Sequence, residues 1–195
     1  MARDRQPVLK KCRTLGLDPS IIGVNKRSKR NLRPNANRKP TEYANQLREK
    51  QKAKFVYGIM EKQFYKLYEE ATRKEGVTGE LLLQYLERRL DNVVYRLGFG
   101  ATRRQARQIV SHGHILINGK KVDIASYRVK QGDVITLKEN SRELSMVKTS
   151  VGQKTVPGWL SLEDATLTAK VLENPGRDAV DFEINEAMII EFYSR

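Results

Sequence analysis

The sequence holds few of the residues from which enzymes and exported proteins build their sites. Its one cysteine, Cys12, excludes an internal disulfide and fits a reducing compartment. One cysteine and two histidines, His112 and His114, cannot form a zinc site of four Cys or His ligands. Gly98 and Gly100 do not complete a GxGxxG motif, and there is no P-loop. We therefore expect neither a metal nor another cofactor.

Long hydrophobic runs are also missing. No apolar run approaches the ~18 residues of a membrane-spanning helix, and no signal-peptide core follows the N-terminus, so we expect no membrane insertion. The hydrophobic fraction of 39% still allows a modest core. A chain of 195 residues is long enough for one medium domain or two small ones.

Positive charge is what the sequence has in excess, with a net charge of +14 and a pI near 9.9. Residues 1–54 contain 16 Lys and Arg against 4 Asp and Glu, whereas residues 160–195 contain 3 against 8. Such an excess is tolerated most easily where a polyanion, or an acidic membrane surface, neutralises it. The pattern suggests that one end meets phosphate and the other meets protein. A solvated charged face is the alternative.

Residues 1–40 form a basic arm without a sustained helical or strand period. Proline interrupts any regular element at Pro7, Pro19, Pro34 and Pro40. The arm has too little apolar area to offset its conformational entropy. We expect it to be disordered or loosely folded alone and to become ordered on RNA.

Helical patterns follow the arm. After the N-cap Thr41, apolar residues recur at helical spacing as far as Ala71, and Gly58 leaves open whether this is one helix or two. A further helix is expected from Thr78 to Gly98. Its apolar stripe consists of Leu82, Leu86, Leu90, Val93 and Leu97.

A short helix and a hairpin follow in residues 102–122. Thr102 is the expected N-cap, and Asn118-Gly119 is typical of a type I′ hairpin turn. A projection at 100° per residue places the polar side chains on one arc of about 140° and the apolar ones opposite. The polar arc holds Arg103, Arg104, Arg107 and Gln108, and the apolar side holds Ala106, Ile109 and Val110.

The three arginines are therefore expected on a solvent face, beside Lys120 and Lys121 of the hairpin. Guanidinium groups bind phosphates through paired hydrogen bonds and stack on unpaired bases. Folded RNA is recognised largely by shape, backbone and exposed loops. This unit is therefore predicted to bind RNA; the alternative is a helix whose arginines are merely solvated.

The rest of the chain gives weaker patterns. Residues 127–138 contain short strand segments, Trp159 and Leu160 return to a core, and residues 168–173 fit a strand. The acidic end, 183–195, fits either a short helix or a final strand.

Arg89-Leu90-Asp91 raises the question of catalysis, because an Arg-Leu-Asp triplet supplies the catalytic aspartate of pseudouridine synthases that carry a small RNA-binding module. Here the triplet lies inside the leucine-striped helix, upstream of the module, and no separate catalytic domain follows. We therefore interpret Asp91 as a helix-surface or salt-bridging residue, and we do not expect an enzyme.

Three segments together resemble the bacterial-type family of small-subunit ribosomal protein S4, in a zinc-free form. They are YANQLREKQKAKFVYGIMEKQF (43–64), RRLDNVVYRLGFGATRRQARQIVSHGHILINGKKVDIASYRVKQGD (88–133) and EINEAMIIEFYSR (183–195). The resemblance spans nearly the whole chain in the same order. The middle segment alone would indicate only the widespread S4-type RNA-binding module.

The resemblance implies an α+β fold in three parts. A helical first domain comprises residues 41–91, rejoined by 166–195. An RNA-binding α/β module, a helix pair with short antiparallel strands, is inserted at 92–165. The flexible basic arm, 1–40, precedes both.

The resemblance also implies a structural protein of the small ribosomal subunit. Members of the family bind the 5′ domain of 16S rRNA directly and early in assembly. They contact ribosomal protein S5 through a surface linked to decoding accuracy, and they line the channel through which messenger RNA enters. Some repress their own messenger. We expect a cytoplasmic location in the ribosome, with a plastid ribosome left open, and no small-molecule substrate.

Matching positions imply the residues that contact RNA. The candidates are Arg103, Arg104, Arg107, Lys120 and Lys121 in the module, Arg48, Lys50 and Lys52 in the first domain, and Arg3, Arg13 and Arg33 in the arm. Arg38 and Lys39 match a basic cluster that faces incoming messenger RNA, although Thr41 stands where another basic residue is often found.

Two departures from the family pattern affect what the resemblance implies. Many relatives carry a Cys-rich N-terminal zinc knuckle, but here only Cys12 remains and Leu9 occupies the expected partner position, so zinc is not expected. Many relatives also carry a Pro-Gly-Gln-His-Gly-like loop. Here the chain reads LRPNANRKP (32–40), so the contacts of that loop are not transferred.

Two other functions stay open at this point. An RNA-modifying enzyme would isomerise uridine in a test with the pure protein. A free RNA-binding chaperone or heat-shock factor built on the same module would need neither the helical first domain nor the basic arm. It would be found outside mature small subunits.

Overall fold

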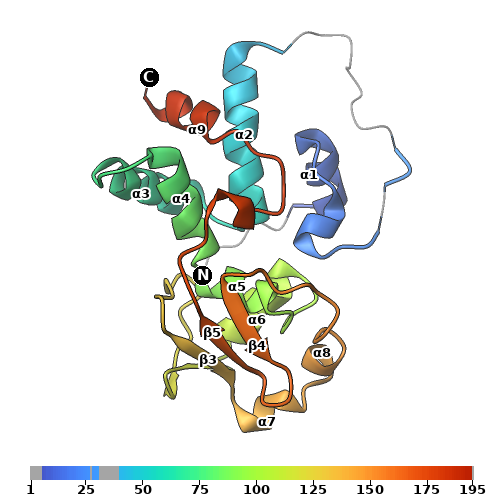
Figure 1. Cartoon of the computed structure of the whole chain (residues 1–195). Coiled ribbons are helices and arrows are strands. Elements are labelled where there is room, and N and C mark those ends of the chain that lie inside the picture. Colours follow the sequence, from blue (N-terminus) through green and yellow to red (C-terminus); the bar gives the residue numbers. More distant parts are fainter. Residues whose placement is uncertain (1–5, 27, 31–39, 195) are drawn as a thin grey trace. The chain divides into compact units, whose positions relative to one another are not determined.

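The structure is a computed structural model that describes residues 6–26, 28–30 and 40–194. They form two compact units (Figure 1). The helical unit comprises the residues up to Leu83 together with those from Val180 onward, and the sheet unit is Gln84–Ala179. Helices and a small antiparallel sheet make this an α+β fold, as the resemblance implied. Four predicted contact residues lie outside the described residues: Arg3, Arg33, Arg38 and Lys39.

The helical unit is built from short helices. They are α1 (Val8–Leu15), the 3-10 turn η1 (Pro19–Ile22), α2 (Glu42–Val56), α3 (Glu61–Thr72), the first part of α4 (Thr78–Glu87) and α9 (Glu186–Tyr193). Among the described residues, no helix is long and apolar enough to cross a membrane.

The arm contains regular structure that the sequence did not reveal. The prediction that residues 1–40 lack any such element is wrong for α1, which buries Cys12 and Leu15, and for η1. Pro7 is the N-cap residue of α1, and Pro19 is the first residue of η1. Proline is tolerated there because an N–H at a helix start has no intrahelical partner. Ordering of the rest of the arm on RNA stays a prediction.

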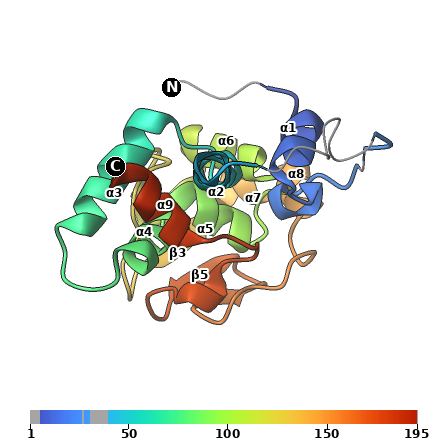
Figure 2. The ribbon, with the colours of Figure 1, turned by 90° about the horizontal axis from the view of Figure 1, so that it is seen from above.

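Gly58 lies between α2 and α3, so residues 41–72 form two helices and not one. Its φ of 62° is a left-handed conformation that glycine adopts readily. Thr41 caps α2 as predicted, since its hydroxyl accepts from the N–H of Ala44 at 3.3 Å. The acidic C-terminal segment forms α9, which lies beside α2 and close to α3 (Figures 1 and 2).

The sheet unit contains the remaining elements. They are the end of α4, α5 (Leu90–Arg96), α6 (Arg103–Ser111), β1 (Ile115–Ile117), β2 (Lys120–Lys121), β3 (Val134–Leu137), α7 (Glu139–Arg142), α8 (Ser145–Lys148), β4 (Leu160–Glu163), β5 (Thr168–Val171) and the 3-10 turn η2 (Arg177–Ala179).

The strands form one antiparallel sheet in the order β2-β1-β3-β5-β4. Alternate side chains of β1, β3 and β5 are buried in a core with apolar residues of α5 and α6. Trp159 and Leu160 are buried, and β5 forms within residues 168–173, so both predictions are confirmed. Because β5 lies beyond residue 165, we now propose residues 84–179 as the limits of the RNA-binding domain.

The single helix predicted for residues 78–97 is wrong. The chain is extended at Arg89 (φ −65°, ψ 136°), so α4 ends before it and α5 begins after it. Arg89 forms an antiparallel β-bridge with Arg128, and the N–H of Leu90 donates to the carbonyl of Tyr127 at 2.8 Å. These bonds replace helical ones, and the continuous leucine stripe of the sequence conceals the break.

Candidate nucleic-acid interface

The basic helix α6 is held firmly against α5. Thr102 caps it as predicted, accepting from the N–H of Gln105 at 3.1 Å, and Gln105 Oε1 accepts from the N–H of Ala101 at 2.8 Å. Gly100 allows the close approach, because a Cβ there would lie 2.8 Å from the backbone nitrogen of Ala106. The packing of the two helices therefore fixes the backbone of α6 and the face that it turns toward α5.

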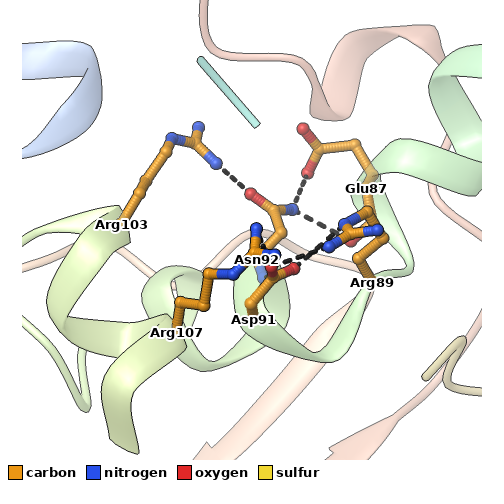
Figure 3. Close-up of polar contacts among 6 residues, drawn as sticks. All are labelled: Glu87, Arg89, Asp91, Asn92, Arg103 and Arg107. Atoms are coloured by element: carbon orange, nitrogen blue, oxygen red, sulfur yellow. Dashed lines mark hydrogen bonds and ion pairs between the residues drawn. The ribbon is translucent and has the colours of Figure 1, made fainter. Parts of the chain in front are cut away.

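Two of the three arginines of α6 face inward (Figure 3). Arg103 is 8% exposed and Arg107 is 9% exposed. Arg103 Nη1 donates to Asn92 Oδ1, and Arg107 Nη1 lies 3.4 Å from Asp91 Oδ2. The guanidinium of Arg103 also lies 4.5 Å from the ring centroid of Tyr95. The prediction of a solvent face for all three arginines is therefore wrong for Arg103 and Arg107.

Asp91 is the acceptor at the centre of this cluster. Arg89 binds it through two hydrogen bonds, from Nε to Oδ1 at 3.1 Å and from Nη2 to Oδ2 at 2.8 Å. The N–H of Asn92 also donates to Oδ1, at 3.0 Å. Of the two readings of Asp91, the salt-bridging one is confirmed and the helix-surface one is wrong, because the residue is buried.

A second carboxylate extends the cluster to α4. Arg96 binds Glu87 through Nε at 3.1 Å and Nη2 at 2.9 Å. Asn92 Nδ2 donates to Glu87 Oε2 at 2.8 Å, so Asn92 links both carboxylates to Arg103 (Figure 3). A buried charge is tolerated only when it is paired and hydrogen-bonded, which these contacts achieve. The cluster therefore joins α4, α5 and α6 internally.

Fewer cationic side chains of α6 and its hairpin point outward than the sequence predicts. Arg104, Lys120 and Lys121 are exposed, and we call these three the exposed basic set. The I′ turn is confirmed, since Asn118 and Gly119 have φ values of 50° and 78°. The Lys121 side chain runs over Gly113, just after α6, so closely that a Cβ there would collide with it. The hairpin thus brings a cation to the end of α6.

The residues of the helical unit that were predicted to contact RNA differ from one another in burial and in partners. Lys50 is buried, donates to Glu61 Oε1 at 2.9 Å and lies 4.1 Å from the ring centroid of Phe192. Lys52 pairs with Glu49 at 2.6 Å within α2. Because Lys50 serves the packing of α2 against α9, we do not include it in the proposed RNA face. Arg13 and Arg48 are half-buried on α1 and α2.

Glu61 joins three helices of this unit. Burial would raise the pKa of Glu61, but hydrogen bonds from Lys54, Tyr193 and Lys50 lower it to about 2. The Tyr193 hydroxyl donates to Glu61 Oε1 at 2.6 Å. Burial and this carboxylate raise the pKa of Tyr193. The contact fixes the end of the chain to α2 and α3.

Sequence reasoning missed several residues of the interior cluster, Glu87, Asn92 and Arg96 among them. It also missed Lys154, whose Nζ donates to the carbonyl of Gly100 at 2.8 Å and lies 3.3 Å from the ring centroid of Tyr95. One signal was present, because Asp91 and Asn92 are polar residues in a largely apolar segment, 90–95, and polar side chains that become buried need partners. The part of the chain that the structure describes has no group of three His, Cys, Asp or Glu that could hold a metal ion.

Comparison with known proteins covers the whole chain. Residues 3–87 match the ribosomal protein S4/S9 N-terminal domain, and residues 88–135 match the S4 domain. The chain is 65% identical over 195 residues to the small ribosomal subunit protein uS4 of Fusobacterium nucleatum subsp. nucleatum. It is 51% identical over 199 residues to that of Lachnoclostridium phytofermentans, and 47% over 203 residues to that of Nocardia farcinica. Each comparison covers 100% of both chains.

Proposed function

The chain belongs to the uS4 family of small ribosomal subunit proteins, and from that premise we propose that it binds ribosomal RNA through the exposed basic set. The family is structural and not enzymatic. Asp91 accords with this, because both its carboxylate oxygens accept hydrogen bonds from Arg89. We therefore set aside the RNA-modifying alternative and place the protein in cytoplasmic ribosomes.

The observation that carries the proposal is the arrangement of Arg104, Lys120 and Lys121 on a rigid scaffold inside the S4 domain. Contacts of α6 with α5 fix the helix, and a tight turn fixes the hairpin. Because the backbone is already fixed, binding a phosphate needs to order only the side chains of these cations. Arg104 can bind a phosphate through two hydrogen bonds, while each lysine acts as a point charge.

The family resemblance supplies the finer proposals. The RNA would be the 5′ domain of 16S rRNA, bound early so that the protein nucleates assembly of the subunit. Ribosomal protein S5 and messenger RNA in its channel would be further neighbours, with an effect on decoding accuracy. Repression of its own messenger is a secondary proposal. The match of residues 3–87 to the N-terminal ribosomal domain favours all of these over a free chaperone, which would not need that domain.

Specific binding is tested by measuring the affinity of the full chain for a transcript of the 5′ domain and for an unrelated RNA of equal length, over a range of salt. If about six phosphates are neutralised, the slope of log K against log salt should lie near −4 to −5. We expect tight binding to the 5′ domain alone. Equal, weak binding to both RNAs would favour the chaperone.

The proposed face is tested by a charge-matched pair of variants. One replaces the exposed basic set (Arg104→Ala, Lys120→Ala, Lys121→Ala). The other replaces three exposed lysines elsewhere in the sheet unit (Lys130→Ala, Lys148→Ala, Lys170→Ala). The first should make the salt slope shallower by about two to three, and the control should change it far less. Equal losses would mean that total charge alone drives binding.

A further inference from the structure

The two histidines of the chain lie at the end of α6, where His112 is the C-cap residue and Gly113 follows with a φ of 72°. The N–H of Gly113 donates to the carbonyl of Val110 at 2.8 Å. The N–H of His114 donates to the carbonyl of Ile109 at 3.3 Å. These two bonds form a Schellman motif, which pairs the last carbonyls of a helix. The centroids of the two imidazole rings lie 6.0 Å apart.

Lysines of the sheet lie beside these histidines. The ammonium nitrogen of Lys121, on β2, lies 3.0 Å from the position that a Cβ at Gly113 would take. Lys138 follows β3, and its N–H donates to the carbonyl of His114 at 3.0 Å. Within the described residues, neither lysine forms an ion pair. The end of α6 therefore combines two imidazoles with two ammonium groups that no carboxylate neutralises.

The two rings differ in how they are held. His114 is half-buried, and its Nδ1 lies 2.9 Å from the hydroxyl oxygen of Ser141 on α7. In the part of the chain that the structure describes, Nε2 of His114 has no hydrogen-bond partner. His112 is exposed. One ring is therefore oriented by the fold, and the other can turn toward a ligand.

Positive charge dominates the surroundings of His114. Burial lowers the pKa of His114, and the positive charges of His112 and Lys138 lower it further. The other charged groups of the neighbouring elements are Lys120 and Lys121 on β2 and Glu139 and Arg142 on α7. Glu139 is the one carboxylate among them, and it is exposed. An anion that offsets these cations would favour the protonated form of His114.

We propose that the two histidines, with Lys121 and Lys138, form a binding site for a backbone phosphate of the RNA, and that binding takes up a proton. A protonated imidazole donates from both ring nitrogens. Rings at this separation are close enough for the oxygens of one phosphate to reach both. The inference rests on the proposed function for the identity of the RNA. It extends the exposed basic set to the end of α6 and makes RNA affinity depend on pH.

The test compares the full-length wild type with the double variant His112→Gln, His114→Asn at about pH 6 and pH 8 and constant salt. The variant removes every histidine of the chain, and histidine is the side chain that ordinarily titrates in this range. We expect the wild type to bind the 5′-domain transcript about tenfold more tightly at the lower pH, and the variant to change at most about twofold. The same pH dependence in both proteins would overturn the proposal.

Calorimetry measures the proton directly and separates this inference from the proposed function. Titrations near pH 7 in two buffers of different ionisation enthalpy should show that the wild type takes up more protons than the double variant, by up to about one. Equal uptake would overturn the proposal, even if the wild type binds the 5′ domain specifically. If the wild type does not prefer the 5′ domain, the proposed function fails, and the difference in uptake on either RNA still decides whether the histidines bind RNA.

Inorganic phosphate tests the site without RNA. NMR titration of the two imidazoles should give a higher pKa for His114 in phosphate than in chloride of equal ionic strength. An unchanged pKa would contradict a phosphate site. A higher pKa in phosphate, together with RNA binding whose pH dependence is the same in wild type and variant, would indicate a site for free phosphate and would overturn the RNA ligand.

Two further variants control for folding and for charge. His112→Gln alone changes an exposed residue, so it carries the test if circular dichroism shows that the double variant is unfolded. The full wild-type pH dependence in that folded variant would overturn the proposal. Lys138→Gln should make the salt slope shallower by about one, whereas Lys130→Gln, at an exposed position in the same unit, should retain it. Equal slopes for the two lysine variants would contradict the part given to Lys138.

Discussion

The basic helices α2 and α6 were both predicted to face RNA, but each also pairs a cationic side chain with a carboxylate of its own unit. In the helical unit, Lys50 of α2 binds Glu61, whose side chain is 47% exposed. In the sheet unit, Arg107 of α6 lies against Asp91, whose side chain is 6% exposed. Each helix therefore forms an ion pair, but the carboxylate is half-exposed in the helical unit and buried in the sheet unit.

Burial decides what each contact is worth. An ion pair near water gains little, because solvent screens it, and its loss leaves groups that water can still reach. Removing one partner of a buried pair leaves an uncompensated charge in a poorly polarisable interior. The sheet unit should therefore respond to changes in its polar cluster far more strongly than the helical unit responds to changes at Glu61.

Asp91→Ala should give the largest effect. It would leave Arg89 and Arg107 buried without their carboxylate. We expect the free energy of unfolding to fall by about 3–5 kcal/mol, measured by urea denaturation of the full chain. Asp123→Ala, at an exposed position in the same unit, is the matched control and should change it by less than about 0.5 kcal/mol. Similar values for both variants would refute the role given to burial.

Alanine at Gly100 or Gly79 tests the difference between the units through packing alone. A Cβ at Gly100 would lie 2.8 Å from the backbone of Ala106, which cannot move without displacing α6. A Cβ at Gly79 would lie 2.8 Å from Cγ and 3.0 Å from Cβ of Glu186. Rotation can move the Cγ, while the Cβ moves only with a small shift of α9, and the helix preference of alanine offsets part of that cost.

Gly100→Ala should therefore cost about 1–3 kcal/mol of unfolding free energy, and Gly79→Ala should cost less, because the helix preference of alanine, about 1 kcal/mol, offsets part of its contact with Glu186. Thermal or urea unfolding of the two variants measures both values. Gly158→Ala, where nothing lies within 4 Å, provides the control for the sheet unit. A neutral Gly100→Ala would show that α6 is not tightly packed.

Glu61→Gln should give the smallest effect, about 1 kcal/mol or less at neutral pH, because the side chain is half-exposed. The pKa of Glu61 in the folded protein, about 2, lies below its ordinary value of 4.5. Its ionised form therefore stabilises the fold above pH 4.5, and this contribution is lost as the pH falls toward 2. The difference in stability between wild type and variant should shrink over that range. A pH-independent difference would contradict the account.

Local patterns predicted much of the fold. The cap at Thr102, the turn at Asn118-Gly119 and the buried Trp159 depend on nearby residues or simple hydrophobicity, and each was found. The break at Arg89 was missed because its bonds come from residues 125–129, far along the chain. A periodic pattern within one segment cannot show partners that lie so far along the chain.

The candidate site was predicted less completely for the same reason. A helical projection shows that Arg103 and Arg107 lie on the polar arc, but it does not show which part of that arc a neighbouring helix covers. Asn92 and Asp91, which receive these arginines, lie on that neighbouring helix, α5. Arg104 is exposed as predicted. Its contact with RNA, like those of Lys120 and Lys121, stays a prediction.

The most direct test of the central claim measures stability and RNA affinity on the same two variants. Arg103→Ala with Arg107→Ala should lower the free energy of unfolding by at least about 2 kcal/mol, because both side chains lie in the buried cluster. Arg104→Ala with Lys120→Ala should change it by less than about 0.5 kcal/mol and weaken binding to the 5′-domain transcript at least tenfold. The opposite pattern, a stable inner variant that loses RNA and an outer variant that keeps it, would contradict the claim.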